Sequence, residues 1–137
     1  MMEFDTLRIA ARIENLNRAM EFVEEKAVHF GLNPKKRFGA LLALEEAFVN
    51  ICRYAYPRGE GDVALLCGGE GELFVLEITD TGDPFDVLSL PEPDLTASIV
   101  ERKIGGLGIH FIRKLSDSAS YRRVRNQNVL RLAFNRA

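Results

Sequence analysis

The chain is expected to form a two-layer α/β (α+β) sandwich, in which helices cover one face of a mixed, mostly antiparallel sheet. Segments with alternating apolar and polar residues, the pattern of half-buried strands, cluster around residues 62–79 and 121–134. Two longer stretches, around residues 16–30 and 35–56, repeat apolar residues every three or four positions, as amphipathic helices do. A doubly wound sheet would need strands and helices in regular alternation, and this chain lacks that order.

The first part of the chain is expected to contain one strand and two helices. Residues 4–13 alternate between apolar and polar side chains, which predicts a strand. Asn15 is a residue type that caps helices and Gly31 is typical of a helix end, so the first helix should lie between them. Pro34 should then begin a second helix, which continues over residues 35–56.

A hairpin is expected next. Residues 62–67 and 72–79 are both strand-like, and the glycine-rich residues 68–71 should form the turn between them. This turn is not a P-loop, because it lacks the Gly-Lys-Ser/Thr ending that binds nucleotide phosphates.

The last third of the chain is expected to hold an irregular segment, a helix and a second hairpin. Residues 87–103 show no clean period, so no secondary structure is predicted there. Residues 106–115 predict a helix. The chain should end in two strands, residues 121–125 and 128–134, that turn at residues 126–127.

The bulk composition is that of a soluble globular protein. The chain has 137 residues, of which 47% are hydrophobic and 28% charged, so we expect a single domain over residues 1–137. A net charge of −2 gives no general attraction to nucleic acid or to a membrane. No apolar run reaches the roughly 18 residues needed to span a bilayer, and no signal-peptide pattern is present. Cys52 and Cys67 lack Cys-x-x-Cys spacing, which indicates reduced thiols rather than a disulfide or a zinc site. We therefore expect a cytoplasmic protein.

Positive charge is concentrated after residue 112. Only one acidic residue, Asp117, occurs among the basic residues Arg113, Lys114, Arg122, Arg123, Arg125, Arg131 and Arg136. We interpret this stretch as a solvated basic face; a surface that docks a partner or steers phosphate is the alternative.

Three short motifs carry the chemistry. Glu46 and Asn50 are four positions apart on the second predicted helix, so they share one face. Alone, this pair would be read as a solvated polar face. Two motifs further along the chain change that balance: Asp80-Thr81-Gly82-Asp83-Pro84-Phe85-Asp86 and Gly105-Gly106-Leu107-Gly108-Ile109.

The order Glu-x-x-x-Asn, Asp-x-Gly, Gly-x-Gly resembles the N, G1 and G2 boxes of the GHKL ATP-binding superfamily. Within it, the short chain, the Asp-x-Gly-x-Pro-Phe-Asp form and Gly-Gly-Leu-Gly-Ile look most like bacterial anti-sigma factors that are serine-protein kinases. The resemblance covers nearly the whole chain and implies the Bergerat-type, histidine kinase-like ATPase fold. It also implies ATP and Mg²⁺ as cofactors.

The resemblance implies a role for each motif. Asp80 would accept a hydrogen bond from the adenine amino group, and Gly82 would leave room for the ring. Asn50 would bind magnesium through its side-chain oxygen, a ligand type that suits this hard cation. Glu46 would be the general base that takes the proton from a substrate hydroxyl. Further nucleotide contacts would come from Pro84, Phe85, Arg102, Lys103, Gly105, Gly106, Leu107 and Gly108.

Simpler readings exist for these residues. Asp80 could form an Asx turn after a strand, and the glycine motif could be no more than a helix start. The relatives often have His where this chain has Tyr54, so the role of that His is not carried over. His29 and His110 are not candidate phosphoacceptors, and we expect both to be partly buried.

The favoured function is an ATP-dependent serine/threonine-protein kinase that acts as an anti-sigma factor. It would bind a sigma factor, or instead bind and phosphorylate a small anti-anti-sigma (STAS-type) protein, and the added charge would break the second complex. The alternative is a non-catalytic module of the same fold that senses ATP or ADP. A hydrolytic ATPase ranks last, because such relatives use a lysine from a following domain. The resemblance also allows a homodimer.

Overall fold

The structure, a computed structural model, describes residues 3–89 and 112–136. Its main elements follow one another as β1 (Glu3–Ala10), α1 (Leu16–His29), α2 (Pro34–Asn50), β2 (Asp62–Glu70), β3 (Leu73–Asp80), β4 (Ser118–Val124) and β5 (Gln127–Asn135). A short π-helical turn (Ile51–Ala55) extends α2, and 3₁₀ turns occur at Ile13–Asn15 and Val87–Ser89. Residues 112–115 are helical.

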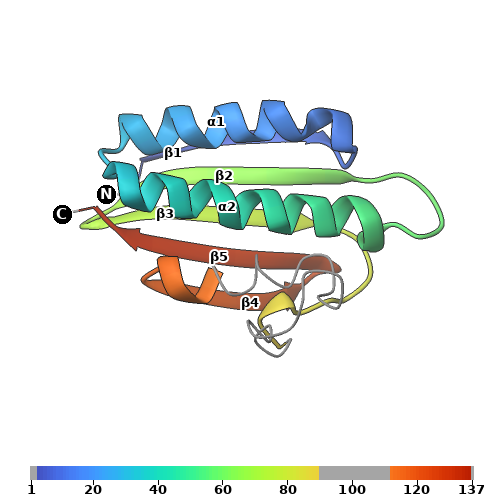
Figure 1. Ribbon diagram of the computed structural model, residues 1–137. Coiled ribbons are helices and arrows are strands. Elements are labelled where there is room, and N and C mark those ends of the chain that lie inside the picture. Colours follow the sequence, from blue (N-terminus) through green and yellow to red (C-terminus); the bar gives the residue numbers. More distant parts are fainter. Residues whose placement is uncertain (1–2, 90–111, 137) are drawn as a thin grey trace, which may run out of the picture.

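The five described strands form one antiparallel sheet in the order β1-β2-β3-β5-β4. Both α1 and α2 lie on the same face of this sheet (Figure 1). The predicted α+β sandwich is therefore confirmed. Because β5 lies between β3 and β4, the last residue of β3, Asp80, pairs in register with Asn128 near the start of β5.

The core between the helices and the sheet fixes α2 against the central strands. Side chains with no exposed surface come from both layers and include Leu44, Phe48, Leu65, Phe74, Leu76, Leu132 and Phe134. Full burial of each such Leu or Phe contributes about 2 kcal/mol. This packing holds the C-terminal part of α2 over the edge of the sheet where β3 ends.

The N-terminal corner differs from the prediction. The strand ends at Ala10 rather than continuing to residue 13, and a 3₁₀ turn precedes α1. Asn15 does not cap α1 with its side chain; its Nδ2 instead donates to the Ala10 carbonyl at 2.9 Å. The cap prediction was wrong because this side chain closes the corner after the strand.

The first hairpin turns later than predicted. β2 continues through Gly68 and Gly69 to Glu70, and the turn lies at Gly71, whose φ is +58°. Gly68 is required inside the strand because a Cβ there would lie 2.5 Å from the Glu3 carbonyl oxygen. Gly68 therefore allows β1 and β2 to approach closely, a Cβ on Gly69 would meet the Arg136 guanidinium, and neither glycine forms the turn.

The second hairpin turns one residue earlier than predicted. Arg125 and Asn126 have φ values of +50° and +65°, the left-handed pair that two-residue hairpins use. This turn places Asn128 on the same side of β5 as Leu130 and Leu132, which face the helices. A slip of one residue in the pairing of β5 with β3, which joins Asn128 to Asp80, would have turned Asn128 to the opposite face.

Helix α2 begins and continues as predicted. Asn33 caps it by accepting a hydrogen bond from the Lys36 backbone N–H at 2.9 Å, and Pro34 occupies the first turn. The predicted helical span to residue 56 is met by α2 and the π turn together. The predicted irregular segment contains the short Val87–Ser89 turn, and most of the predicted helix over residues 106–115 lies outside the described residues.

Arginines of the basic C-terminal stretch are partly used inside the fold. From β5, Arg131 donates to Glu77 on the neighbouring strand β3 and to Glu70 at the end of β2, each at 2.9 Å. Arg136 donates to the Gly71 carbonyl at 2.8 Å. The stretch is therefore in part a set of structural contacts rather than only a solvated face.

The two cysteines are free thiols, as predicted. Cys67 is fully buried in β2, and burial raises its pKa to about 12. None of the described helices combines the length and the apolar character that a bilayer-spanning segment needs.

Candidate nucleotide-binding site

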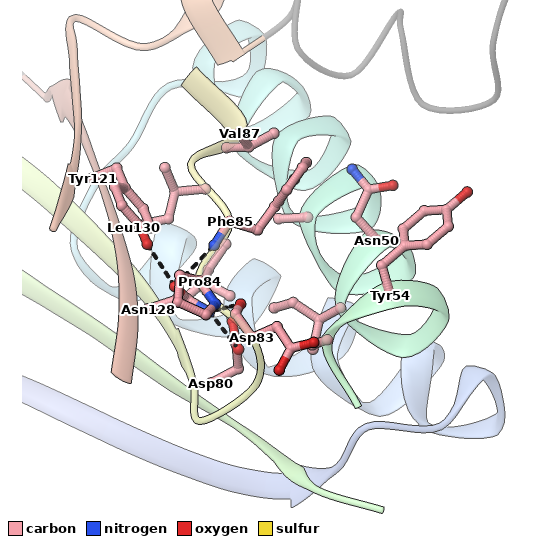
Figure 2. Close-up of a pocket in the computed structure, with 14 residues that line it drawn as sticks. Asn50, Tyr54, Asp80, Asp83, Pro84, Phe85, Val87, Tyr121, Asn128 and Leu130 are labelled. Carbon is pink, nitrogen blue, oxygen red and sulfur yellow. Dashed lines mark hydrogen bonds between the residues drawn. The ribbon is translucent and has the colours of Figure 1, made fainter. Parts of the chain in front are cut away.

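A pocket of about 160 Å³ opens between the end of α2 and the edge of the sheet (Figure 2). One side comes from the helix and its π turn, and we call Asn50 and Tyr54 there the helix wall. The opposite side, the strand wall, is formed by Asp80, Tyr121 and Asn128. The remaining lining residues are mostly apolar: Ala47, Ile51, Ala55, Ile78, Asp83, Pro84, Phe85, Val87 and Leu130.

Asp80 is a buried carboxylate at the end of β3, with 6% of its surface exposed. Its Oδ1 accepts hydrogen bonds from the Gly82 backbone N–H and from Asn128 Nδ2, both at 2.9 Å. The bond from Gly82 is the Asx turn that the simpler reading expected. Within the described residues, Oδ2 has no hydrogen-bond partner. A buried carboxylate oxygen without a partner is costly, and a donor from a bound ligand would satisfy it.

Asn128 is a site residue that the sequence analysis missed. It is also 6% exposed, and it lies on the helix-facing side of β5. Its Oδ1 accepts from Tyr121 Oη at 2.6 Å and from the Phe85 N–H at 3.3 Å, and its Nδ2 also donates to the Asp83 carbonyl at 2.8 Å. The sequence contained one indication of this role. Asn128 is polar, whereas the next residues on the same face of the predicted strand are apolar.

Gly82 allows the segment after β3 to approach the end of the helix. A Cβ on Gly82 would lie 2.3 Å from the carbonyl oxygen of Ala55. The Asp83 N–H donates to that same carbonyl at 3.0 Å, and Arg123 donates to the Gly82 carbonyl at 2.7 Å. Gly82 itself does not line the pocket. Its described role is thus close packing of the loop on the helix, whereas the resemblance implied space for a ring.

Pro84 and Phe85 follow in the same segment and both line the pocket. Phe85 has 45% of its surface exposed, and its backbone N–H is the group held by Asn128. Four residues of the motif therefore border the cavity: Asp80, Asp83, Pro84 and Phe85.

Glu46 and Asn50 are brought together on α2, as their spacing predicted. Asn50 Nδ2 donates to Glu46 Oε1 at 3.3 Å, which leaves the Asn50 side-chain oxygen as an acceptor at the pocket. Glu46 lies one turn away and is outside the pocket lining. Burial raises the pKa of the Glu46 carboxyl, and this outweighs the lowering by the Asn50 hydrogen bond and the Arg53 charge.

The donor set of α2 suits a hard cation. A side-chain amide oxygen is a ligand type that magnesium accepts, and magnesium usually completes its shell with water and phosphate oxygens. Among the described residues no group of three or more His, Cys, Asp or Glu side chains could hold a metal.

The neighbouring residues separate into site and surface. Tyr54, at the position where relatives often have His, lines the pocket with 59% of its surface exposed. Glu45 is exposed, as expected for a surface residue. His29 is exposed rather than partly buried, which corrects the prediction, and His110 lies outside the described residues.

The predicted phosphate contacts lie outside the described residues. They are Arg102, Lys103, Gly105, Gly106, Leu107 and Gly108. The structure therefore brings together the predicted adenine and magnesium residues and leaves the phosphate motif as a prediction.

Comparisons with known proteins identify the family of this chain. Residues 9–134 match the model of the histidine kinase-like ATPase domain family. Serine/threonine-protein kinase BtrW from Bordetella bronchiseptica is 27% identical over 134 residues, which cover 97% of this chain and 94% of BtrW.

A solved structure is similar in fold. The RsbU and RsbW domains of Rv1364c from Mycobacterium tuberculosis match with a TM-score of 0.62 at 15% identity. The match covers 96% of this chain but 32% of that one, so the present chain spans about a third of its length. Since the family model covers nearly the whole sequence, the chain belongs to the histidine kinase-like ATPase domain family.

Proposed function

We propose that this chain is an ATP-dependent serine/threonine-protein kinase that acts as an anti-sigma factor. The observation that carries this proposal is the pair Glu46 and Asn50. A half-buried carboxylate with a raised pKa is hydrogen-bonded to an amide whose oxygen lies at the ATP pocket. The name of the relative BtrW, a serine/threonine-protein kinase, supports the same activity.

The strand wall would bind the base of ATP. Asp80 Oδ2, which lacks a partner among the described residues, would accept the hydrogen bond from the adenine amino group. The apolar side chains that line the rest of the pocket would cover the ring faces. Arg102, Lys103 and the residues 105–108 remain the proposed phosphate contacts, on the basis of the sequence resemblance.

The C-terminal part of α2 would hold the metal and supply the general base. Asn50 would bind Mg²⁺ through its side-chain oxygen, and the bound ion would neutralise charge on the phosphate oxygens. Glu46 would take the proton from a serine or threonine hydroxyl as that oxygen attacks the terminal phosphate. A base works best when its pKa is near the working pH, so the upward shift at Glu46 favours this role.

The partners follow from the same proposal. We infer that the chain binds a sigma factor, and alternatively binds and phosphorylates a small anti-anti-sigma protein of the STAS type. A phosphate adds about −2 charge to that partner and would release it. The solved neighbour that combines RsbU and RsbW domains is consistent with a switch of this kind.

The first test is calorimetric titration of ATP into the wild type and Asn50→Ala, with and without magnesium. We expect magnesium to strengthen binding in the wild type and to have little effect in Asn50→Ala. Failure of the wild type to bind ATP at millimolar concentration would contradict the proposed site.

The second test measures phosphate transfer from ATP to an anti-anti-sigma protein encoded beside this chain. Glu46→Gln should lower the transfer rate roughly 10²- to 10⁴-fold, the usual contribution of a general base, and leave ATP affinity unchanged. Glu45→Gln is the matched control, because the neighbouring carboxylate is exposed. ATP binding without any transfer by the wild type would favour the alternative, a module that senses ATP or ADP.

A further inference from the structure

Asn128 connects every part of the strand wall. Its four hydrogen-bond partners belong to three segments: the end of β3 at Asp80, the following loop at Asp83 and Phe85, and β4 at Tyr121. All four of these residues line the pocket (Figure 2). The loop between Asp80 and Phe85 has no regular secondary structure, so its shape depends on such contacts.

The polar atoms of Asn128 are fully used by the protein. A side-chain amide offers two donors and two acceptor positions. Both donors of Asn128 are taken by Asp80 and Asp83, and both acceptor positions by Phe85 and Tyr121. Asn128 therefore has no hydrogen-bonding capacity left for a ligand.

Asp80 has the complementary arrangement. Asn128 and Gly82 both donate to its Oδ1. The second oxygen, Oδ2, is the acceptor that a ligand could use. The amide of Asn128 thus determines which carboxylate oxygen is occupied and which is available.

We propose that Asn128 is the positioning residue for base selection in this site. It would hold Asp80 so that Oδ2 reads an exocyclic amino donor, and so favour 6-aminopurines over bases without that group. This role rests on the proposed ATP site. It assigns Asn128 no contact with the nucleotide, and Asn128 acts on base selection only through Asp80.

The experiment compares binding of ATP with binding of purine riboside triphosphate, which lacks the 6-amino group. The wild type should prefer ATP by about tenfold or more, because the analogue leaves the Asp80 oxygen unpaired. Asn128→Ala should weaken ATP binding about tenfold and bring the ratio of the two affinities close to one. Circular dichroism and thermal unfolding would show that each variant is folded.

A double-mutant cycle separates positioning from direct contact. In an Asp80→Ala background, the added change Asn128→Ala should have no further effect on ATP affinity, since Asn128 acts through Asp80. A full additional loss in that background would overturn the positioning role. An unchanged preference for ATP in the single variant would overturn it as well. A wild type that binds neither nucleotide would instead remove the ATP site itself, and this role with it.

Asn128→Asp provides a further test, the pH dependence of the preference for ATP, which a purely structural role of Asn128 would not change. The nearby charged or titratable groups among the described residues are Asp80, Asp83, Tyr121 and Arg123. At low pH the new carboxyl can keep its proton and donate it to Asp80, which preserves that bond and gives up the one to the Asp83 carbonyl. When it ionises, the two carboxylates repel. As the pH rises from about 5 to about 8, the preference of this variant for ATP should therefore decrease relative to that of the wild type. If the ratio of the affinities for ATP and purine riboside triphosphate changed with pH in this variant only as it does in the wild type, the proposal would be contradicted.

Discussion

The two walls of the pocket are built differently. On the strand wall, Asp80 and Asn128 are each 6% exposed and joined by a hydrogen bond of 2.9 Å. On the helix wall, Tyr54 is 59% exposed, and Asn50 has a single described side-chain bond of 3.3 Å to Glu46. The side proposed to bind the base is thus ordered in advance, which would lower the entropy lost on binding. The side that would hold metal and phosphate is left for the ligand to complete.

The strand wall should be the more sensitive side for binding. In Asp80→Asn the Gly82 and Asn128 donors require the amide oxygen at the Oδ1 position, so the amide NH₂ replaces the free oxygen and the acceptor for the adenine amino group is lost. We expect ATP affinity to fall roughly 10- to 100-fold, the range of a hydrogen bond to a charged group. Isothermal calorimetry would measure it.

Asp83→Asn is the control for charge alone at this site. Asp83 also lines the pocket, but its side chain is exposed and its described contacts use the backbone. A loss of affinity equal to that of Asp80→Asn would mean that the pocket senses total charge rather than the position of Asp80.

The contact between the two walls should be sensitive to a single methyl group. Gly82→Ala places a Cβ against the Ala55 carbonyl and must displace either the loop or the helix end. We expect the free energy of unfolding to fall by about 1–3 kcal/mol, as for other overpacked sites. Urea unfolding would show it. Gly59→Ala is the matched control, because no atom lies within 4 Å of its added Cβ; equal losses in both variants would exclude the contact as the cause.

The contrast also explains what the sequence could predict. The spacing of Glu46 and Asn50 was sufficient, because a helix has one period and places residues four apart on one face. The Asp80 motif was found by its resemblance, and its strand ends where expected. In both cases the information lies within a few consecutive residues.

Asn128 could not be found in that way. Its partners are up to 48 positions away and meet it only because β5 inserts between β3 and β4. Its direction further depends on the register of β5 against β3, which pairs Asn128 with Asp80. The role of Gly82 was similarly hidden, because the atom that excludes a side chain there belongs to Ala55. Contacts of this kind follow from strand order, which local patterns do not contain.

The helix wall should show smaller effects on binding. Tyr54→Ala removes an exposed ring at the pocket edge, and we expect ATP affinity to fall roughly two- to tenfold, while Tyr54→Phe should leave it unchanged. Phe38→Ala is the control, since that ring on α2 is 64% exposed and does not line the pocket. A Tyr54→Phe variant as weak as Tyr54→Ala would show that the hydroxyl, rather than the ring, contacts the nucleotide.

The smallest expected effect concerns the contribution of Glu46, one turn before the helix wall on α2, to the stability of the fold. Burial raises the pKa of Glu46 above its ordinary value of 4.5. The folded state therefore holds this proton more strongly than the unfolded chain, and the stabilisation is present below pH 4.5 and lost as the pH rises through the folded pKa. At neutral pH the ionised, partly buried carboxylate lowers the free energy of unfolding, so Glu46→Gln should unfold at a higher temperature than the wild type. That difference should shrink when both are acidified to about pH 4. Glu45→Gln, on the exposed neighbour, should show no such dependence, and a Glu46→Gln variant equal to the wild type at every pH would mean that the carboxylate is not desolvated in the absence of ligand.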